Sequence, residues 1–207
     1  MRLPIRVATL AAASLFSVHT FALGLLQPLN LWWSDGRQDN ATMVTPEENQ
    51  SAASAGYQFI RVEGCVQQEY EPGMKPLYLY YGNWRADNMS TATPQGMQDA
   101  QSAGYQNLGI EGYIFDYQAP GTVPLNLYYS DARRDNFSTA TPEGNNDAMA
   151  AGYRFIRTEG YVYPGAACQG AASYGPSPYP VGPGPFYPHN DHGWDHGRDH
   201  GGDHDHR

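Results

Sequence analysis

The sequence predicts a mainly β fold with short helices, built from three ββαβ(β) repeats. The first observation is internal repetition: Pro28, Pro76 and Pro124 lie 48 residues apart, and the segments that follow them align without a gap. The second is composition, because each segment alternates short aromatic or β-branched runs with polar turns and one Ala-rich stretch. Units this small cannot bury their apolar faces alone, so we expect three units to share one core.

The similarity of the three units predicts that they close about a pseudo-threefold axis. An open solenoid needs distinct polar capping units, and a propeller usually has four or more blades. Four predicted strands in each unit favour a β-trefoil-like arrangement. An extra helix in every unit is not a standard trefoil feature, so another threefold β arrangement stays open.

The first half of each repeat is predicted to be a hairpin followed by a helix. In the third repeat, residues 125–129 are rich in leucine and tyrosine and predict a strand, and residues 137–140 predict a second strand after a polar turn. Thr141, Pro142 and Glu143 then supply an N-cap, a proline at the first helical position and an acid in the first turn.

The second half of each repeat is predicted to end the helix and return as two short strands. Gly152 suits the left-handed position after a helix C-terminus. Residues 153–158 predict a third strand, residues 159–160 a Glu-Gly turn, and residues 161–163 a fourth strand.

The N-terminal segment has the composition of a signal peptide. Arg2 and Arg6 precede and flank a short apolar run, residues 7–16, and Thr20 and Ala22 are small residues at the positions that signal peptidase reads. We therefore expect residues 1–22 to be removed on export to the periplasm or the extracellular space. The apolar run is too short to span a membrane, although a retained N-terminal anchor is the alternative.

The rest of the chain divides into a repeat domain and a tail. The predicted domain covers residues 23–169, with repeats at 28–75, 76–123 and 124–169. Residues 170–207 are rich first in Pro, Tyr and Gly and then in His and Asp, a composition typical of disorder. The tail could bind Zn²⁺, Cu²⁺ or Ni²⁺ or could simply aid solubility. Its histidines are His189, His192, His196, His200, His204 and His206.

Charge and histidine content exclude several functions for the repeat domain. Residues 23–169 contain 16 Asp and Glu against 8 Lys and Arg, a balance that disfavours nucleic acid and anionic lipid as partners. The same residues contain no histidine, which excludes Ser-His-Asp and Cys-His catalysis and histidine-based zinc sites. We expect no enzyme activity and no cofactor in the folded domain.

Two cysteines, Cys65 and Cys168, flank most of the repeat array. In an oxidising compartment an even count favours a disulfide, which would tie the two ends of the array together. Two buried or free thiols are the alternative.

The most distinctive repeated motif is Arg-x-Asp-Asn, which follows an aromatic pair at the end of the first predicted strand. Aromatic faces beside planar polar groups are what a sugar site needs, and three copies would make the protein multivalent. The alternative is structural, because Asp and Asn form Asx-turns and Arg can pair with a neighbouring carboxylate. The candidate ligand-binding residues are Trp33, Arg37, Asp39, Asn40, Tyr81, Arg85, Asp87, Asn88, Tyr129, Arg133, Asp135 and Asn136.

A second repeated acid occurs at Glu63, Glu111 and Glu159, each followed by glycine. Two facing carboxylates can hydrolyse a glycoside, but threefold symmetry would hold equivalent acids apart. We therefore expect these glutamates to form turns.

The motifs together resemble an uncharacterised repeat family of secreted bacterial and fungal proteins. The shared signature is Tyr-Tyr, Asp-x-Phe-x-Thr, Gly-Tyr and Glu-Gly-x-x-Tyr-Val, and it is clearest in residues 124–163. Repeat one departs from it, with Ala-Thr-Met at residues 41–43 and with Cys65 in place of tyrosine. Such repeats are often appended to secreted hydrolases, so the resemblance implies an accessory binding module without an active site.

The sequence thus predicts a secreted, non-enzymatic binding module for carbohydrate or cell-envelope polysaccharide. The alternative is a structural or protein-interaction protein of the envelope with a metal-binding His/Asp tail.

Overall fold

The computed structural model describes residues 26–168, so the predicted signal peptide and the His/Asp tail with its candidate metal-binding histidines lie outside the described residues. The described part is mainly β with short helices, as predicted, and its element order is ββαβ in each repeat. In chain order the elements are β1 (Leu26–Ser34), β2 (Asp39–Met43), α1 (Pro46–Ser54) and β3 (Gln58–Gln67); β4 (Met74–Gly82), β5 (Asp87–Thr91), α2 (Pro94–Ser102) and β6 (Gln106–Phe115); β7 (Val123–Ser130), β8 (Asp135–Thr139), α3 (Pro142–Ala150) and β9 (Arg154–Val162); and the 3₁₀-helix η1 (Gly165–Cys168).

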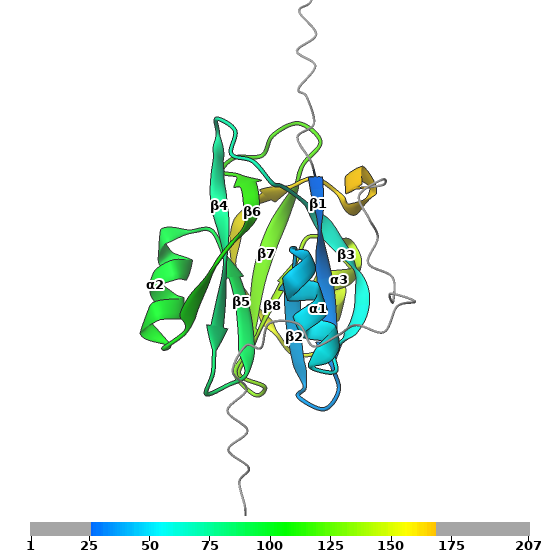
Figure 1. Cartoon of the computed structure of the whole chain (residues 1–207), viewed down its shortest axis with the longest axis vertical. Coiled ribbons are helices and arrows are strands. Elements are labelled where there is room, and N and C mark those ends of the chain that lie inside the picture. The colour runs from blue at the N-terminus through cyan, green and yellow to red at the C-terminus, as the bar shows by residue number, and fades with distance from the viewer. Residues whose placement is uncertain (1–25, 169–207) are drawn as a thin grey trace, which may run out of the picture.

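Each repeat forms a three-stranded antiparallel sheet with its first strand in the middle. Strand β1 pairs with β2 on one side and β3 on the other, and β4 and β7 pair with their neighbours in the same way. The helix connects the two outer strands, and Figure 1 shows α2 outside the β4–β5 hairpin and α1 in front of β1 and β2.

The helix boundaries follow the predicted signals. Thr141 accepts a hydrogen bond from the backbone N–H of Gly144 at 3.0 Å, and a proline follows the capping threonine in every repeat. Gly152 has φ +80°, the left-handed conformation that glycine adopts at least cost after a helix.

The predicted Glu-Gly turn is wrong, because the third and fourth predicted strands are one continuous strand. In the pairing of β1 with β3, Leu29 faces Gly64 and Asn30 faces Val62, so Glu63 is the extra residue of a β-bulge. Glu111 and Glu159 are bulged in the same way. A bulge bends the strand and re-aims a side chain without ending the sheet, which a Glu-Gly pair in the sequence does not distinguish from a turn.

Neighbouring repeats join through single residue pairs of their long strands. Gln67 of β3 pairs with Tyr113 of β6, and Phe115 of β6 pairs with Tyr161 of β9. Cys65 of β3 exchanges two backbone hydrogen bonds with Tyr163, at 2.8 and 3.1 Å. Each repeat therefore pairs with both others. The predicted β-trefoil-like arrangement is not confirmed, since each repeat supplies three strands and a helix.

The repeats also share their cores. The central cluster is made of repeat-equivalent side chains, with Leu29, Leu77 and Leu125 fully buried at its heart. Three outer clusters each take most of their side chains from one repeat and one leucine from the next, and these leucines are Leu79, Leu127 and Leu31. No repeat can therefore be removed without exposing the apolar surface of another.

Cys65 and Cys168 form a disulfide across 103 residues of sequence, as predicted. Leu26 packs against the bond, which fastens η1 to β3. In the chain-entropy model, closing a loop of this size stabilises the fold by roughly 4–5 kcal/mol.

Within residues 26–168, the helices are all too short and too polar to cross a membrane.

Candidate functional site

The three aspartates of the Arg-x-Asp-Asn motifs meet in the interior of the domain. Asp39, Asp87 and Asp135 begin β2, β5 and β8, and their carboxylate oxygens lie within 4.8 Å of one another. All three side chains are buried. We call Asp39, Asp87 and Asp135 the axial aspartates.

A left-handed residue precedes each axial aspartate and turns the chain inward. Gln38, Ala86 and Arg134 have φ of 55°, 55° and 58°, and their backbone N–H groups close the hairpin turns on the carbonyl groups four residues earlier. This conformation is costly for residues with a Cβ atom, and it occurs at the same position in every repeat.

Hydrogen bonds tie the axial aspartates to the tyrosines that follow the helices and to the next repeat. The Tyr153 hydroxyl donates to Asp135, and Tyr57 and Tyr105 donate to the aspartates of their own repeats. Asn40 Nδ2 donates to Asp135 at 2.9 Å across a repeat boundary, and Asn136 donates to Asp87 in the same way. These bonds give the Asp and Asn of the motif a role in joining repeats.

Burial makes the axial aspartates retain protons. Burial, followed by the charges of the other two aspartates, raises the pKa of Asp39 to about 10. Burial and the charge of Asp135 raise the pKa of Asp87 to about 8, although bonds from Tyr105 and Asn136 oppose the rise. The pKa of Asp135 is also raised by burial. Three carboxylate oxygens at this spacing are also the ligand type that Mg²⁺ and Ca²⁺ prefer, so the cluster could hold such an ion in place of its protons.

The other motif residues line three equivalent pockets between neighbouring repeats. In each pocket, the arginine and the post-helix tyrosine of one repeat face the aromatic side chain and the asparagine of the next. Pocket 1/2 contains Arg37, Tyr57, Tyr81 and Asn88; pocket 2/3 contains Arg85, Tyr105, Tyr129 and Asn136; pocket 3/1 contains Arg133, Tyr153, Trp33 and Asn40.

The structure therefore brings together most of the predicted site residues, but in a different grouping. Each predicted set was drawn from one repeat, whereas each pocket combines two repeats. The axial aspartates do not line the pockets. The pockets differ in size, with volumes of about 60 Å³ for pocket 1/2, 340 Å³ for pocket 2/3 and 190 Å³ for pocket 3/1.

The motif arginines contact aromatic side chains. Arg85 Nη1 donates to the Tyr129 hydroxyl at 3.1 Å, and its guanidinium lies 4.0 Å from the centre of the Trp84 ring. Arg133 lies 5.5 Å from the ring centre of Trp33, the equivalent of Tyr129. Such contacts hold the guanidinium in place without neutralising it.

Sequence reasoning missed the ion pairs at the back of two pockets. Arg157 donates to Asp99 at 2.7 Å in pocket 2/3, and Arg61 pairs with Asp147 at 2.8 Å in pocket 3/1. The sequence pattern that could have revealed these ion pairs is an arginine two residues before the repeated glutamate. Repeat two has Gly109 in place of this arginine.

The repeated glutamates are buried anchors for the entry to the helices. Glu159 Oε2 accepts hydrogen bonds from the hydroxyl of Thr91, the N–H of Ala92 and both the N–H and hydroxyl of Thr93, at 2.8–3.0 Å. Glu63 makes the same set of bonds with residues 139–141. Each glutamate thereby fixes the start of a helix in a neighbouring repeat.

Glu111 does not anchor a helix, because Glu48 of repeat one takes that role at the start of α1. Glu48 Oε2 accepts from the N–H groups of Val44 and Thr45 at 3.0 and 2.9 Å. Among the described residues, neither carboxylate oxygen of Glu111 has a hydrogen-bond partner of normal geometry. Burial and the neighbouring charge of Glu48 raise its pKa well above the usual range, and the Ser90 hydroxyl offsets the rise only in part.

Comparison with known proteins identifies a family without an assigned activity. No curated protein and no solved structure matches the chain. One family model matches residues 32–163, a span that begins at the aromatic pair of repeat one and ends at the last tyrosine of repeat three. The chain therefore belongs to the family described as Domain of unknown function (DUF5648).

Proposed function

We propose that this protein is a secreted, non-enzymatic module that binds carbohydrate in the pockets between its repeats. The observation that carries the proposal is the threefold recurrence of one arrangement: an aromatic side chain, a guanidinium and an asparagine around a cavity. The bonds to the axial aspartates account for Asn40 and Asn136, whereas packing alone would not require a guanidinium at the cavity wall.

The chemistry of the pocket wall suits a sugar ring. The faces of Trp33, Tyr81 and Tyr129 offer CH–π contact to the apolar face of the ring. Arginine presents planar donor groups for neighbouring hydroxyls. Three sites on one chain would convert weak single affinities into avidity for a polysaccharide.

We also propose that the repeats close about a pseudo-threefold axis through the axial aspartates. The three single strand pairs between repeats, and the sharing of leucines between clusters, support this closure. Closure would point the three pockets outward around one axis.

The hydrogen bonds of the repeated glutamates support a role without catalysis. Glu63 and Glu159 are engaged by four hydrogen bonds each, and residues 26–168 include no histidine. Export is supported by the disulfide, which an oxidising compartment maintains.

A glycan array probed with the full chain tests the proposal. We expect binding to a defined set of glycans, reduced by Trp33→Ala in pocket 3/1 and by Tyr129→Ala in pocket 2/3. Tyr70→Ala is the control, because that side chain is 62% exposed and lies outside the three pockets. Absence of binding to every glycan at high protein density would refute the proposal and favour a structural or protein-interaction role.

A further inference from the structure

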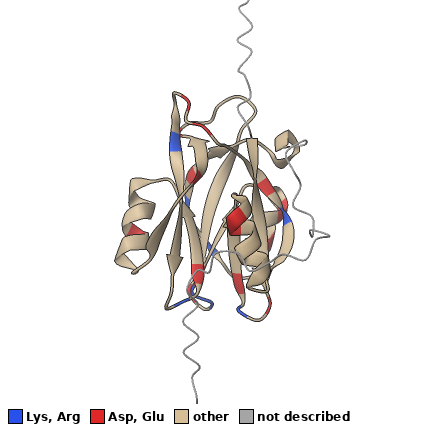
Figure 2. Ribbon diagram, in the orientation of Figure 1, with Lys and Arg blue, Asp and Glu red and all other residues tan. Residues whose placement is uncertain are grey.

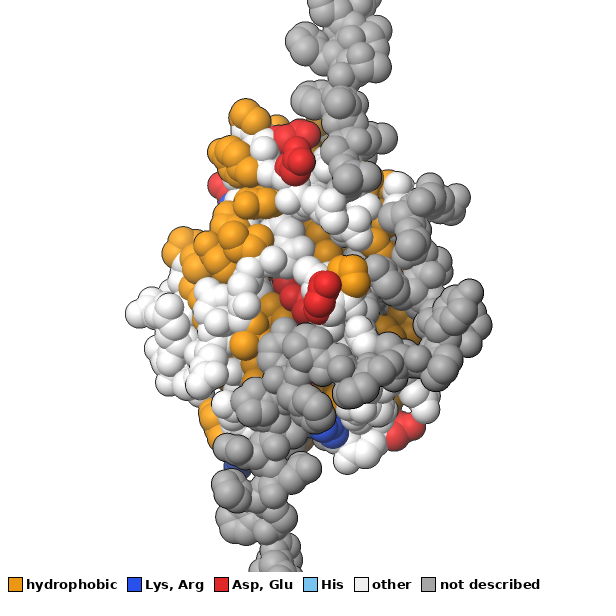
Figure 3. Space-filling model, in the orientation of Figure 1, with side chains coloured by type: hydrophobic (Ala, Val, Ile, Leu, Met, Phe, Trp, Pro, Cys, Tyr) orange, Lys and Arg blue, Asp and Glu red, His pale blue; other side chains and the backbone are white. Residues whose placement is uncertain are grey.

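The basic residues of the domain gather at the pockets. Residues 26–168 contain eight Lys and Arg, and six of them line the three pockets. Only three of the sixteen Asp and Glu in the same residues do so. Figure 2 shows basic segments at the hairpin turns of the lower end as drawn, and the larger blue patches on the face in Figure 3 also lie low. Most positive side chains of this acidic domain therefore line the proposed ligand-binding pockets.

The three pockets differ in the net formal charge of the residues that line them. Pocket 2/3 is lined by Arg85, Arg154, Arg157 and one acid, Asp99. Pocket 3/1 has two arginines with one aspartate, and pocket 1/2 has one arginine with one glutamate. The net formal charge of the walls is therefore +2, +1 and 0 in pockets 2/3, 3/1 and 1/2.

Two of the three arginines in pocket 2/3 can engage a ligand. Arg157 is held by Asp99 and Glu159, so it is already neutralised. Arg85 has no carboxylate within ion-pair distance among the described residues, and its buried Nε–H has no hydrogen-bond partner there.

Arg154 brings a second guanidinium to the same tyrosine. It lies 5.5 Å from the ring centre of Tyr129, whose hydroxyl accepts from Arg85. Its own acid, Asp131, is 76% exposed, so water weakens that ion pair. Repeats one and two have Gln58 and Gln106 at the equivalent position, which makes the pair of arginines specific to pocket 2/3.

From this arrangement we infer that pocket 2/3 binds a sugar residue that carries a carboxylate, that is, a uronic acid within a glycan. The inference rests on the proposed carbohydrate-binding function and names the ligand class of one of its sites. Arg85 and Arg154 would each donate to the carboxylate, since guanidinium groups match carboxylates in shape as well as charge. The formal net charge of −9 repels a long polyanion, so the pocket is suited to a short acidic stretch of glycan.

Calorimetric titration of the full chain with trigalacturonate and with its carboxyl-reduced, neutral counterpart tests the inference. We expect the acidic trisaccharide to bind about tenfold more tightly, and salt to reduce this preference. Arg154→Gln installs the residue native to the other two repeats at an exposed position, and it should reduce the preference about three- to tenfold. Gln58→Arg, at the position of repeat one equivalent to Arg154, should add affinity for the acidic trisaccharide. Arg134→Gln removes a positive charge outside the three pockets and should leave the preference unchanged.

The outcomes separate this inference from the function on which it rests. Equal binding of the two trisaccharides, or a preference that survives Arg154→Gln, would overturn the uronate assignment while leaving carbohydrate binding in place. A chain that binds neither trisaccharide and no glycan on the array would overturn both. Thermal unfolding at the wild-type temperature establishes that each variant remains folded.

Discussion

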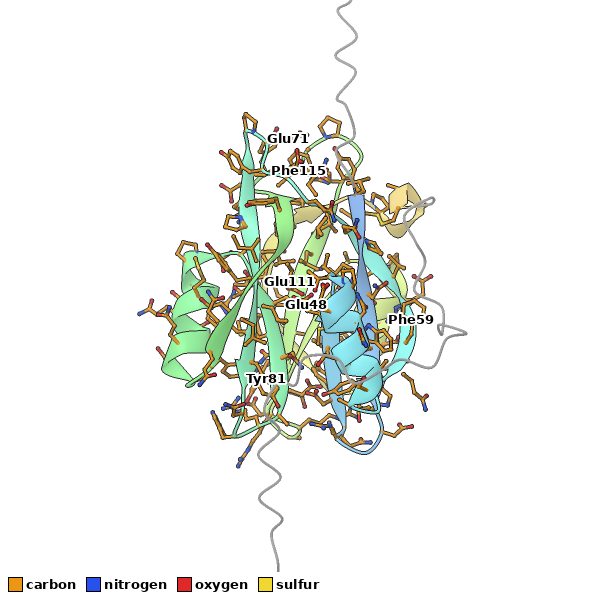
Figure 4. All side chains as sticks on the ribbon, in the orientation of Figure 1. Glu48, Phe59, Glu71, Tyr81, Glu111 and Phe115 are labelled. Atoms are coloured by element: carbon orange, nitrogen blue, oxygen red, sulfur yellow. A yellow bond between two sulfur atoms is a disulfide. The ribbon has the colours of Figure 1, made fainter. Side chains whose placement is uncertain are left out.

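The carboxylate of Glu48 occupies the hydrogen-bonding position that Glu111 would fill if repeat one matched the other two. Figure 4 shows Glu48 and Glu111 side by side near the middle of the molecule. Three changes make the exchange possible. Met43 replaces the threonine that bonds the glutamate elsewhere, Glu48 replaces a glycine, and Gly109 replaces the partner arginine.

The glycine is required where the exchange has not occurred. A Cβ atom at Gly96 would lie 1.8 Å from the Thr91 hydroxyl and 3.0 Å from Glu159 Oε1. In repeat one, a side chain at position 48 is tolerated because Met43, the equivalent of Thr91, has no hydroxyl group to clash with its Cβ atom. We expect Gly96→Ala to lower the free energy of unfolding by ~2 kcal/mol or more, measured by urea denaturation. Gly36→Ala, with open space around the added methyl group, is the control.

Among residues 26–168 the carboxyl of Glu111 has no hydrogen-bond partner of normal geometry, which predicts opposite effects of one substitution at equivalent positions. Glu111→Gln removes a buried group that must stay protonated, and we expect it to raise the free energy of unfolding at pH 8 by ~1–2 kcal/mol. Glu159→Gln leaves four donors and Arg157 without a carboxylate, and we expect a loss of ~2–4 kcal/mol. Similar losses for both variants in urea denaturation would show that Glu111 is partnered in solution.

The axial aspartates predict that the domain loses stability as pH rises. Unfolded aspartates ionise near 3.8, whereas folding raises the pKa of Asp87 to about 8 and that of Asp39 to about 10. The folded state therefore binds more protons than the unfolded state above pH ~4, and stability falls from there through pH 8–10. We expect the melting temperature to fall between pH 5 and 9, and Asp39→Asn to flatten that decline. Asp116→Asn, at a side chain that is 70% exposed, should leave it unchanged.

The left-handed residue of each hairpin predicts a stabilising glycine. Ala86 has φ 55°, so Ala86→Gly relieves a conformational cost and should raise the free energy of unfolding by ~1 kcal/mol. Ala100→Gly, in the buried face of α2, should lower it by a similar amount or more. Calorimetric melting of the two variants shows whether the effects have opposite sign.

The disulfide predicts a large entropic contribution to stability. Replacing both Cys65 and Cys168 with serine should lower the free energy of unfolding by ~4 kcal/mol if loop entropy dominates. Non-reducing mass spectrometry of the exported protein should find no alkylatable thiol; two alkylated cysteines would contradict the bond.

Local signals in the sequence were enough to predict the short helices, their threonine caps, the glycine after each helix and the disulfide. They failed at Glu63 and its equivalents because a bulge and a turn use the same Glu-Gly pair, and only the pairing of β3 with β1 distinguishes them. They also failed in grouping the site, because Arg85 meets Tyr129 across a repeat boundary. That contact depends on how the repeats pack, which their internal spacing does not specify.

A ¹H–¹⁵N NMR titration of the full chain with trigalacturonate tests most directly whether pocket 2/3 binds an acidic glycan. We expect the largest shift changes to cluster at pocket 2/3, around Arg85, Tyr105 and Tyr129. Shift changes centred on Tyr70 and Tyr117 outside the pockets, or none at saturating ligand, would contradict it.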